Sequence, residues 1–253
     1  MSAPGPLPRV PAPAATLITG ATGGIGSAIA RRLASTGAPL VLAGRRSQRL
    51  RALTAELAGA PSRTAWVRAD LTRADGARAV LDAAADGPLG VWVHAVGVEY
   101  PKEIGALTDG EWRQTIAANL GSALVVSREL AARWDRRTPL LLIWIGSRRA
   151  RTESPGNAAY AASKAALASL AASFRAEMGD APLRLSLIEP AVVAGTGLGG
   201  APQTSARALS ADMVAEAAAW LTALPPTVEV PLLTMRHPQD LGPRPPLSGT
   251  SGP

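Results

Sequence analysis

The chain has 253 residues, and 47% of them are hydrophobic, which fits one large α/β domain with a sizeable core. It contains no cysteine and two histidines, so disulfides and thiolate metal sites are excluded and we expect no bound metal. The formal net charge is +7, but the basic residues are scattered and do not alternate with aromatic ones. We therefore expect no nucleic-acid partner.

The two ends of the chain differ in composition from the rest. Residues 1–13 contain five prolines and residues 236–253 show no periodicity, so we expect both to be flexible tails around one domain over residues 14–235. No apolar run approaches the length that a membrane span requires, and the first segment has no apolar core of a signal peptide. We expect a soluble, cytoplasmic protein with no membrane partner.

Seven short apolar segments alternate with alanine- and arginine-rich segments of helical spacing. Near-continuous apolar strands separated by helices indicate a parallel sheet that is covered on both faces. We therefore predict an α/β fold with a doubly wound parallel sheet. The predicted strands cover residues 15–19, 39–43, 64–69, 91–95, 139–145, 183–189 and 227–234.

Helix boundaries are marked by local signals at two places. Thr108 and Glu111 have the spacing of a capping box, which predicts a helix that begins there. Pro155, Gly156 and Asn157 precede an alanine-rich helix, and Gly179 ends it.

A glycine-rich turn, TGATGGIG at residues 19–26, lies directly between the first predicted strand and an amphipathic helix. In that context small residues let the backbone approach a pyrophosphate, whose charge meets the free amides at the helix N-terminus. The alternative is an ordinary strand-to-helix turn that contains glycine. The expected cofactor contacts in this turn are Gly20, Thr22, Gly24, Ile25 and Gly26.

The second predicted strand is followed by Arg45 and Arg46 rather than by an acid. In dinucleotide folds an acid at this place holds the ribose 2′-hydroxyl, whereas an arginine accepts a 2′-phosphate. The first acid after the strand is Glu56, well inside the next helix. We therefore expect NADP(H) to be favoured over NAD(H); the alternative is that both arginines face water.

Tyr160 and Lys164 stand four residues apart in the alanine-rich helix, and the chain has only one other tyrosine, Tyr100, and one other lysine, Lys102. Residues at this spacing project from one face of a helix. A nearby ammonium favours the phenolate, so we expect a pKa for Tyr160 that is lowered toward the working pH, which suits proton exchange with an alcohol or carbonyl. The alternative is an amphipathic pair on a solvent face.

Together, the glycine turn, residues 69–71 (Ala-Asp-Leu), Asn119, Ser147 and the Tyr160–Lys164 pair resemble the short-chain dehydrogenase/reductase family, in its compact branch. Ser147 precedes Tyr160 by the family's usual thirteen positions. The glycine turn also fits the longer, sugar-nucleotide-modifying branch, but too little chain remains after the sixth strand for the extra domain of that branch.

This resemblance implies a Rossmann-like fold and an NADP-dependent short-chain reductase that reduces a ketone or oxidises the corresponding secondary alcohol, with the reductive direction favoured. It implies that Tyr160 is the general acid/base, that Lys164 tunes it and binds the nicotinamide ribose, that Ser147 donates to the carbonyl oxygen, and that Asn119 holds a water-linked proton path. A homodimer or homotetramer is expected on the same ground. The further cofactor contacts that it implies are Asp70, Leu71, Ala95, Gly97 and Val193.

The sequence departs from the family pattern after the fourth and sixth strands. His94 opens a His-Ala-Val-Gly segment where the family has Asn-Asn-Ala-Gly, and we interpret it as a hydrogen-bonded structural histidine rather than a catalytic base. Ala191 replaces a glycine, Thr196 comes one position late, and Glu189 is an unexpected carboxylate near the active-site side of the sheet.

Two further segments bear on the substrate. Residues 195–210 correspond to the family's substrate lid and are short, which predicts an open pocket for a bulky or carrier-tethered carbonyl compound. Arg148, Arg149 and Arg151 follow the fifth strand and could recognise an anionic substrate or a phosphopantetheine arm, or form an exposed loop. The rival functions are an NADP-binding redox sensor without catalysis and a nucleic-acid-binding protein.

Overall fold

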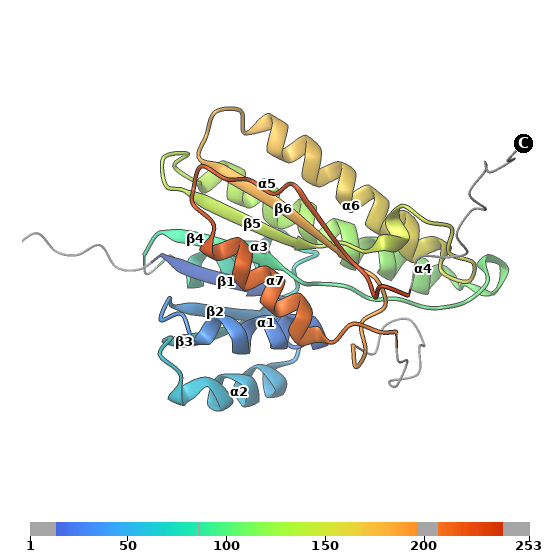
Figure 1. Ribbon diagram of the computed structural model, residues 1–253, viewed down its shortest axis with the longest axis horizontal. Coiled ribbons are helices and arrows are strands. Elements are labelled where there is room, and N and C mark those ends of the chain that lie inside the picture. The colour runs from blue at the N-terminus through green and yellow to red at the C-terminus, as the bar shows by residue number, and fades with distance from the viewer. Residues whose placement is uncertain (1–13, 86, 197–206, 240–253) are drawn as a thin grey trace, which may run out of the picture.

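The computed structural model describes residues 14–85, 87–196 and 207–239 (Figure 1). The expected first tail, residues 240–253 of the expected second tail and most of the expected lid lie outside these ranges. Residues 236–239 are described and form neither helix nor strand. Within the described ranges, no helix has the length and apolar character that crossing a membrane requires.

Within these ranges, seven parallel strands form one sheet with the order β3-β2-β1-β4-β5-β6-β7. The predicted doubly wound, Rossmann-like α/β fold is therefore confirmed. The strands are β1 (Ala15–Thr19), β2 (Leu40–Gly44), β3 (Thr64–Arg68), β4 (Leu89–His94), β5 (Leu140–Ile145), β6 (Leu183–Pro190) and β7 (Leu232–Met235).

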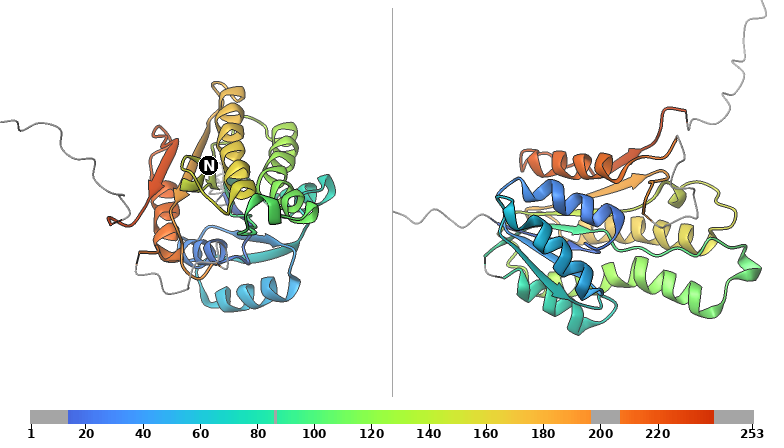
Figure 2. Two further views of the ribbon diagram at one scale, coloured as in Figure 1. Left: turned by 90° about the vertical axis from the view of Figure 1, so that its right-hand side faces the viewer. Right: turned by 90° about the horizontal axis from the view of Figure 1, so that it is seen from below.

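Helices cover both faces of the sheet (Figures 1 and 2). The core on one face includes side chains of α1, α2 and α7, and the core on the other face includes side chains of α3, α5 and α6. The helices are α1 (Gly24–Ala34), α2 (Ser47–Glu56), α3 (Ala74–Ala83), α4 (Asp109–Ile116), α5 (Ser122–Arg133), α6 (Ala158–Glu177) and α7 (Ala211–Ala223). The short helical segments are η1 (Leu57–Gly59), η2 (Ile104–Ala106), the π-helical turn η3 (Ala117–Gly121) and η4 (Arg148–Ala150).

The apolar runs of the central strands supply both cores at once. All six residues of β5 are buried. Leu141 and Ile143 pack into the core beneath α1 and α7, whereas Leu142 and Trp144 pack into the core beneath α5 and α6. Successive side chains of a strand point to opposite faces, so a strand between two helical layers must be apolar at every position.

The predicted helix boundaries are confirmed. The hydroxyl of Thr108 accepts from the Glu111 amide, and the Glu111 carboxylate accepts from the Thr108 amide, which completes the capping box of α4. α6 begins directly after Asn157, and Gly179 follows its end with a φ of 55°. A positive φ there is compatible with glycine because glycine has no Cβ.

The prediction of a strand over residues 227–234 is wrong in its first half. β7 covers only Leu232–Met235. Val228 donates instead to the carbonyl of Pro225 in a turn, and Pro231 precedes the strand. Proline has no amide hydrogen, so it contributes only its carbonyl to the sheet, where it accepts from Leu187.

Candidate active site

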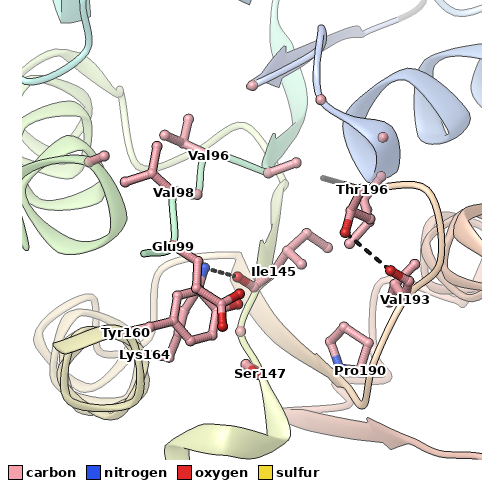
Figure 3. Close-up of a pocket in the computed structure, with 18 of the residues that line it drawn as sticks. Val96, Val98, Glu99, Ile145, Ser147, Tyr160, Lys164, Pro190, Val193 and Thr196 are labelled. Carbon is pink, nitrogen blue, oxygen red and sulfur yellow. Dashed lines mark hydrogen bonds between the residues drawn. The ribbon is translucent and has the colours of Figure 1, made fainter. Parts of the chain in front are cut away.

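A cleft of ≈ 970 Å³ opens at the carboxyl ends of the central strands (Figure 3). β1 and β4 are neighbours there although they are not consecutive, which is the place where open α/β sheets bind their ligands. The predicted site residues that line the cleft are Gly20, Thr22, Gly24, Ile25, Arg45, Arg46, Asp70, Leu71, Ala95, Gly97, Ser147, Tyr160, Lys164 and Val193. Gly26 and Asn119 are not among the lining residues.

The glycine turn between β1 and α1 is closely packed. Gly20 has a φ of 76°, and a Cβ there would lie 2.6 Å from the carbonyl of Ala95. A Cβ on Gly26 would lie 2.3 Å from the carbonyl oxygen of Gly20. Gly26 therefore does not contact the cleft itself. Its lack of a side chain lets the start of α1 pack directly against the Gly20 backbone.

The first turn of α1 fits a pyrophosphate. Its N-cap residue is Gly23, so no side chain accepts hydrogen bonds from the first amides of the helix. These amides have no partner within a helix, and together with the helix dipole they attract an anion. A Cβ on Gly24 would lie 3.0 Å from Cα of Thr196, so the segment after β6 approaches the same turn.

Basic side chains line the cleft beyond β2. Arg45 and Arg46 are exposed, and Arg49, which the sequence analysis missed, joins them from the first turn of α2. The available signal was its place in the first turn of the helix that follows Arg46, at the carboxyl end of β2. Asp70 lies nearby; hydrogen bonds from Thr72 are the main cause of its lowered pKa, and Arg45 contributes.

Lys164 is buried, with 3% of its surface exposed, and its ammonium donates to the carbonyl of Ile145 at 2.8 Å. α6 is built mostly of alanine and serine, so the helix lies close to the sheet and the lysine reaches the end of β5. Burial lowers the pKa of Lys164 to about 8, and the negative charge of Glu99 opposes that shift. The lysine is therefore mainly protonated at neutral pH.

Tyr160 lies one helical turn before Lys164 and is 8% exposed. The lysine nitrogen is 5.8 Å from the centre of the tyrosine ring, so the expected shared face is confirmed. The expected lowering of the tyrosine pKa is wrong in this structure. Burial, followed by the charge of Glu99, raises the pKa of Tyr160 to about 12, although Ser147 and Arg149 act in the opposite direction.

Ser147 stands between β5 and η4, with its hydroxyl close enough to Tyr160 to act on the tyrosine through a hydrogen bond. The hydroxyl also accepts from the backbone amide of Arg149 at 3.2 Å. Ser147 and Tyr160 therefore form one polar corner of the cleft, in which two hydroxyl groups can meet one oxygen atom of a ligand (Figure 3).

Asn119 lies behind the cleft wall, fully buried in the π-helical turn η3. Its side chain accepts from the Val98 amide at 2.7 Å and donates to the Val98 carbonyl and to Ser163. Because Ser163 precedes Lys164 in α6, Asn119 joins the loop after β4 to the helix that carries the tyrosine and the lysine.

His94 is fully buried at the end of β4, as the structural interpretation expected. One ring nitrogen lies 2.9 Å from the Thr19 hydroxyl and the other 3.2 Å from the Ser122 hydroxyl. Burial lowers the pKa of His94 to about 3, so the imidazole is neutral. It is not among the residues that line the cleft.

Two acids enter ion pairs around the cleft. Glu99, which the sequence analysis missed, has a side chain that is 2% exposed and pairs with Arg149. Its position shortly after a strand that ends at the site was the available signal. Glu189 is fully buried and pairs with Arg151 at 2.7 Å, while its second carboxylate oxygen has no hydrogen-bond partner within the described part of the chain.

Residues 14–205 match the family of short chain dehydrogenases. The chain belongs to this family. It is 28% identical over 222 residues to an uncharacterized oxidoreductase of Staphylococcus epidermidis, covering 87% of this chain and 95% of that protein. It is 32% identical over 177 residues to the 2,3-dihydro-2,3-dihydroxybenzoate dehydrogenase of Bacillus subtilis, covering 68% and 67%.

A solved structure of the family supports the same assignment. The alcohol dehydrogenase of the archaeon Thermococcus sibiricus, complexed with 5-hydroxy-NADP, is similar with a TM-score of 0.81 at 28% identity and covers 91% of this chain and 98% of that one. The resemblance stated from the sequence is therefore confirmed. As a short-chain dehydrogenase/reductase, the protein is an oxidoreductase that acts on alcohol or carbonyl groups of small molecules with a nicotinamide cofactor.

The charge of Glu99 predicts a measurable shift in the titration of Tyr160. Glu99→Gln should lower the pKa of Tyr160 from about 12, because a charge that disfavours the phenolate is removed. In a Tyr100→Phe background Tyr160 is the only tyrosine, so tyrosinate absorbance reports this group alone. Because the expected role of Tyr160 as general base in alcohol oxidation uses the phenolate, the pH–rate profile for oxidation should also shift to lower pH in the variant.

Glu153→Gln is the matched control, because Glu153 lines the same cleft and does not contribute to the pKa of Tyr160. The titration midpoint of Tyr160 in the Glu153→Gln variant should equal the midpoint in the Tyr100→Phe parent. A midpoint that stays in place or rises in the Glu99→Gln variant would show that Glu99 does not act on the tyrosine.

Proposed function

We propose that the protein is an NADP(H)-dependent ketoreductase, which reduces a ketone to a secondary alcohol and also catalyses the reverse reaction. The observation that carries the proposal is the buried Tyr160 with Ser147 on one side and the protonated Lys164 on the same helix face. A high tyrosine pKa supports reduction, because the neutral hydroxyl is the form that donates a proton.

The nicotinamide cofactor supplies the hydride. Residues of this chain orient the substrate and transfer the proton. The Ser147 hydroxyl donates to the carbonyl oxygen of the substrate and orients it, and the Tyr160 hydroxyl gives its proton to that oxygen as negative charge develops there. The Lys164 ammonium lies close enough to stabilise the phenolate that remains.

Asn119 acts in this proposal as a positioning residue. Both polar atoms of its side chain are used for contacts with Val98 and Ser163, so it holds the cleft wall and α6 in place. We therefore propose that the Asn119 side chain does not itself donate a hydrogen bond to the water of the expected proton path.

The preference for NADP(H) rests on the basic wall beyond β2. Arg45, Arg46 and Arg49 line the cleft, and Glu56, the first acid after the strand, pairs with Arg31 at 2.6 Å. Three guanidinium groups suit a 2′-phosphate, whereas a ribose 2′-hydroxyl is held by an acid. The similar alcohol dehydrogenase of Thermococcus sibiricus was solved with a derivative of NADP, which agrees with this preference.

A homodimer or homotetramer is part of the proposal. Trp112 on α4 and Leu124 on α5 are large apolar side chains that remain 39% and 51% exposed in the single chain. Apolar side chains of this size at a helical surface favour burial against a second copy.

Tyr160→Phe should reduce kcat for ketone reduction by about 10²- to 10⁴-fold, because the proton donor is lost while the ring remains. The measurement is NADPH oxidation with a panel of ketones of graded bulk, including carrier-bound 3-oxoacyl chains. Tyr100→Phe is the matched control, because Tyr100 lines the same cleft and its hydroxyl donates to Gln114 rather than toward Ser147. NADPH binding without turnover of any ketone would instead support a redox sensor, and a wild-type rate in Tyr160→Phe would contradict the assigned role.

The double variant Arg45→Ala/Arg46→Ala should raise KM for NADPH about 10- to 100-fold more than KM for NADH, because charge-assisted hydrogen bonds to the 2′-phosphate are lost. Arg51→Ala serves as the control, since Arg51 lies over Trp66 and not in the cleft wall. Equal effects of the double variant on both cofactors would contradict the preference.

A further inference from the structure

Arg149 lies beside the reacting corner of the cleft. It follows Ser147 by two residues, and its backbone amide donates to the Ser147 hydroxyl at 3.2 Å. Its guanidinium carbon is 5.9 Å from the centre of the Tyr160 ring. One small molecule can therefore contact the Arg149 guanidinium with one of its groups and the Tyr160 hydroxyl with another.

One edge of this guanidinium is held by a buried carboxylate. The Nη1 atom of Arg149 donates to Glu99, whose side chain is 2% exposed, whereas the Arg149 side chain is 26% exposed. The Asn157 amide, with its nitrogen turned toward Glu99, donates to the same carboxylate. The Glu99 carboxylate thus fixes one edge of the Arg149 guanidinium and limits the conformations that this side chain can adopt.

The other donors of Arg149 remain available. Among the residues that the structure describes, its Nε and Nη2 atoms donate to no protein acceptor, and the residue lines the cleft. A planar guanidinium with two free donors matches the two oxygens of a carboxylate. At this end of the cleft the lining residues Arg148, Arg149 and Lys164 are cationic and Glu99 and Glu153 are acidic, so three cations face two acids and the net charge is positive.

We propose that Arg149 binds a carboxylate of the substrate, so that the protein acts on short oxo acids and the corresponding hydroxy acids. The inference rests on the proposed function above, which places the reacting carbonyl at Tyr160 and Ser147. The closeness of Arg149 to Tyr160 favours an anion on the same small molecule over the remote phosphate of a carrier arm. The carboxylate itself forms and breaks no covalent bond; it orients the carbonyl toward the tyrosine.

The test compares short 3-oxo acids with their methyl esters, using NADPH and the full-length protein as purified. The wild-type kcat/KM should favour the free acid by about 10- to 100-fold, because the ester cannot form charge-assisted hydrogen bonds with Arg149. Arg149→Gln should lose this preference, so that its kcat/KM for the acid equals its kcat/KM for the ester; the ratio is the readout because Arg149 also acts on the pKa of Tyr160. Arg148→Gln makes the same change of charge on the neighbouring residue and should keep the preference.

The outcomes separate this inference from the proposed function. Wild-type turnover of the ester with no preference for the acid would overturn the inference and leave the ketoreductase proposal in place. An equal loss of preference in Arg148→Gln would also overturn it, since the general charge of η4 would then suffice. Failure of the wild type to turn over any acid, ester or ketone with either cofactor would overturn the proposed function and this inference with it.

A binding measurement tests the same contact without turnover. Calorimetric titration of butanoate and butanamide into the NADP⁺-bound protein should show at least about tenfold tighter binding of the carboxylate, and Arg149→Gln should abolish the difference. If Arg149→Gln does not fold, the double variant Glu99→Gln/Arg149→Gln replaces it, because it leaves no unpaired buried charge. Equal binding of butanoate with and without the arginine would overturn the inference.

Discussion

The site depends on one buried hydrogen bond, in which the ammonium of Lys164 donates to the carbonyl of Ile145. An ammonium at 3% exposure is unfavourable unless polar groups satisfy it, and the end of β5 provides an acceptor where the strand leaves the sheet. The same bond ties α6 to the sheet. Because Tyr160 stands one turn earlier in that helix, the contact also fixes the height at which the tyrosine hydroxyl enters the cleft.

Three charged side chains around Tyr160, those of Lys164, Arg149 and Glu99, influence one another as well as the tyrosine. The cationic groups of Lys164 and Arg149 lie 5.8 and 5.9 Å from the centre of the Tyr160 ring, and the negative charge of Glu99 acts on the lysine and pairs with the arginine. Glu99 supports the protonated lysine, holds the arginine and disfavours the phenolate. The result is a tyrosine that keeps its proton at neutral pH, and in the proposed reaction it gives that proton to the substrate oxygen beside an arginine that binds the substrate carboxylate.

Local rules explain what the sequence could predict. The glycine turn, the capping box and the Tyr160–Lys164 spacing depend on neighbouring residues, so they were readable without the fold. Other features depend on burial and on contacts between distant segments. The raised pKa of Tyr160 requires knowledge of its exposure and of Glu99, which approaches from another loop, and the late start of β7 reflects Pro231 against β6. Chain patterns alone carry neither kind of information.

The most direct test of the account replaces each lysine by arginine, since the chain has only Lys164 and Lys102. A planar guanidinium does not replace a compact ammonium in a buried site, whereas Lys102 is 42% exposed and pairs with Glu111 at the surface. With a ketone that the wild type reduces, Lys164→Arg should lower kcat by about 10²-fold or more while Lys102→Arg leaves it unchanged. A folded Lys164→Arg variant with the wild-type kcat would contradict the central role of the buried ammonium.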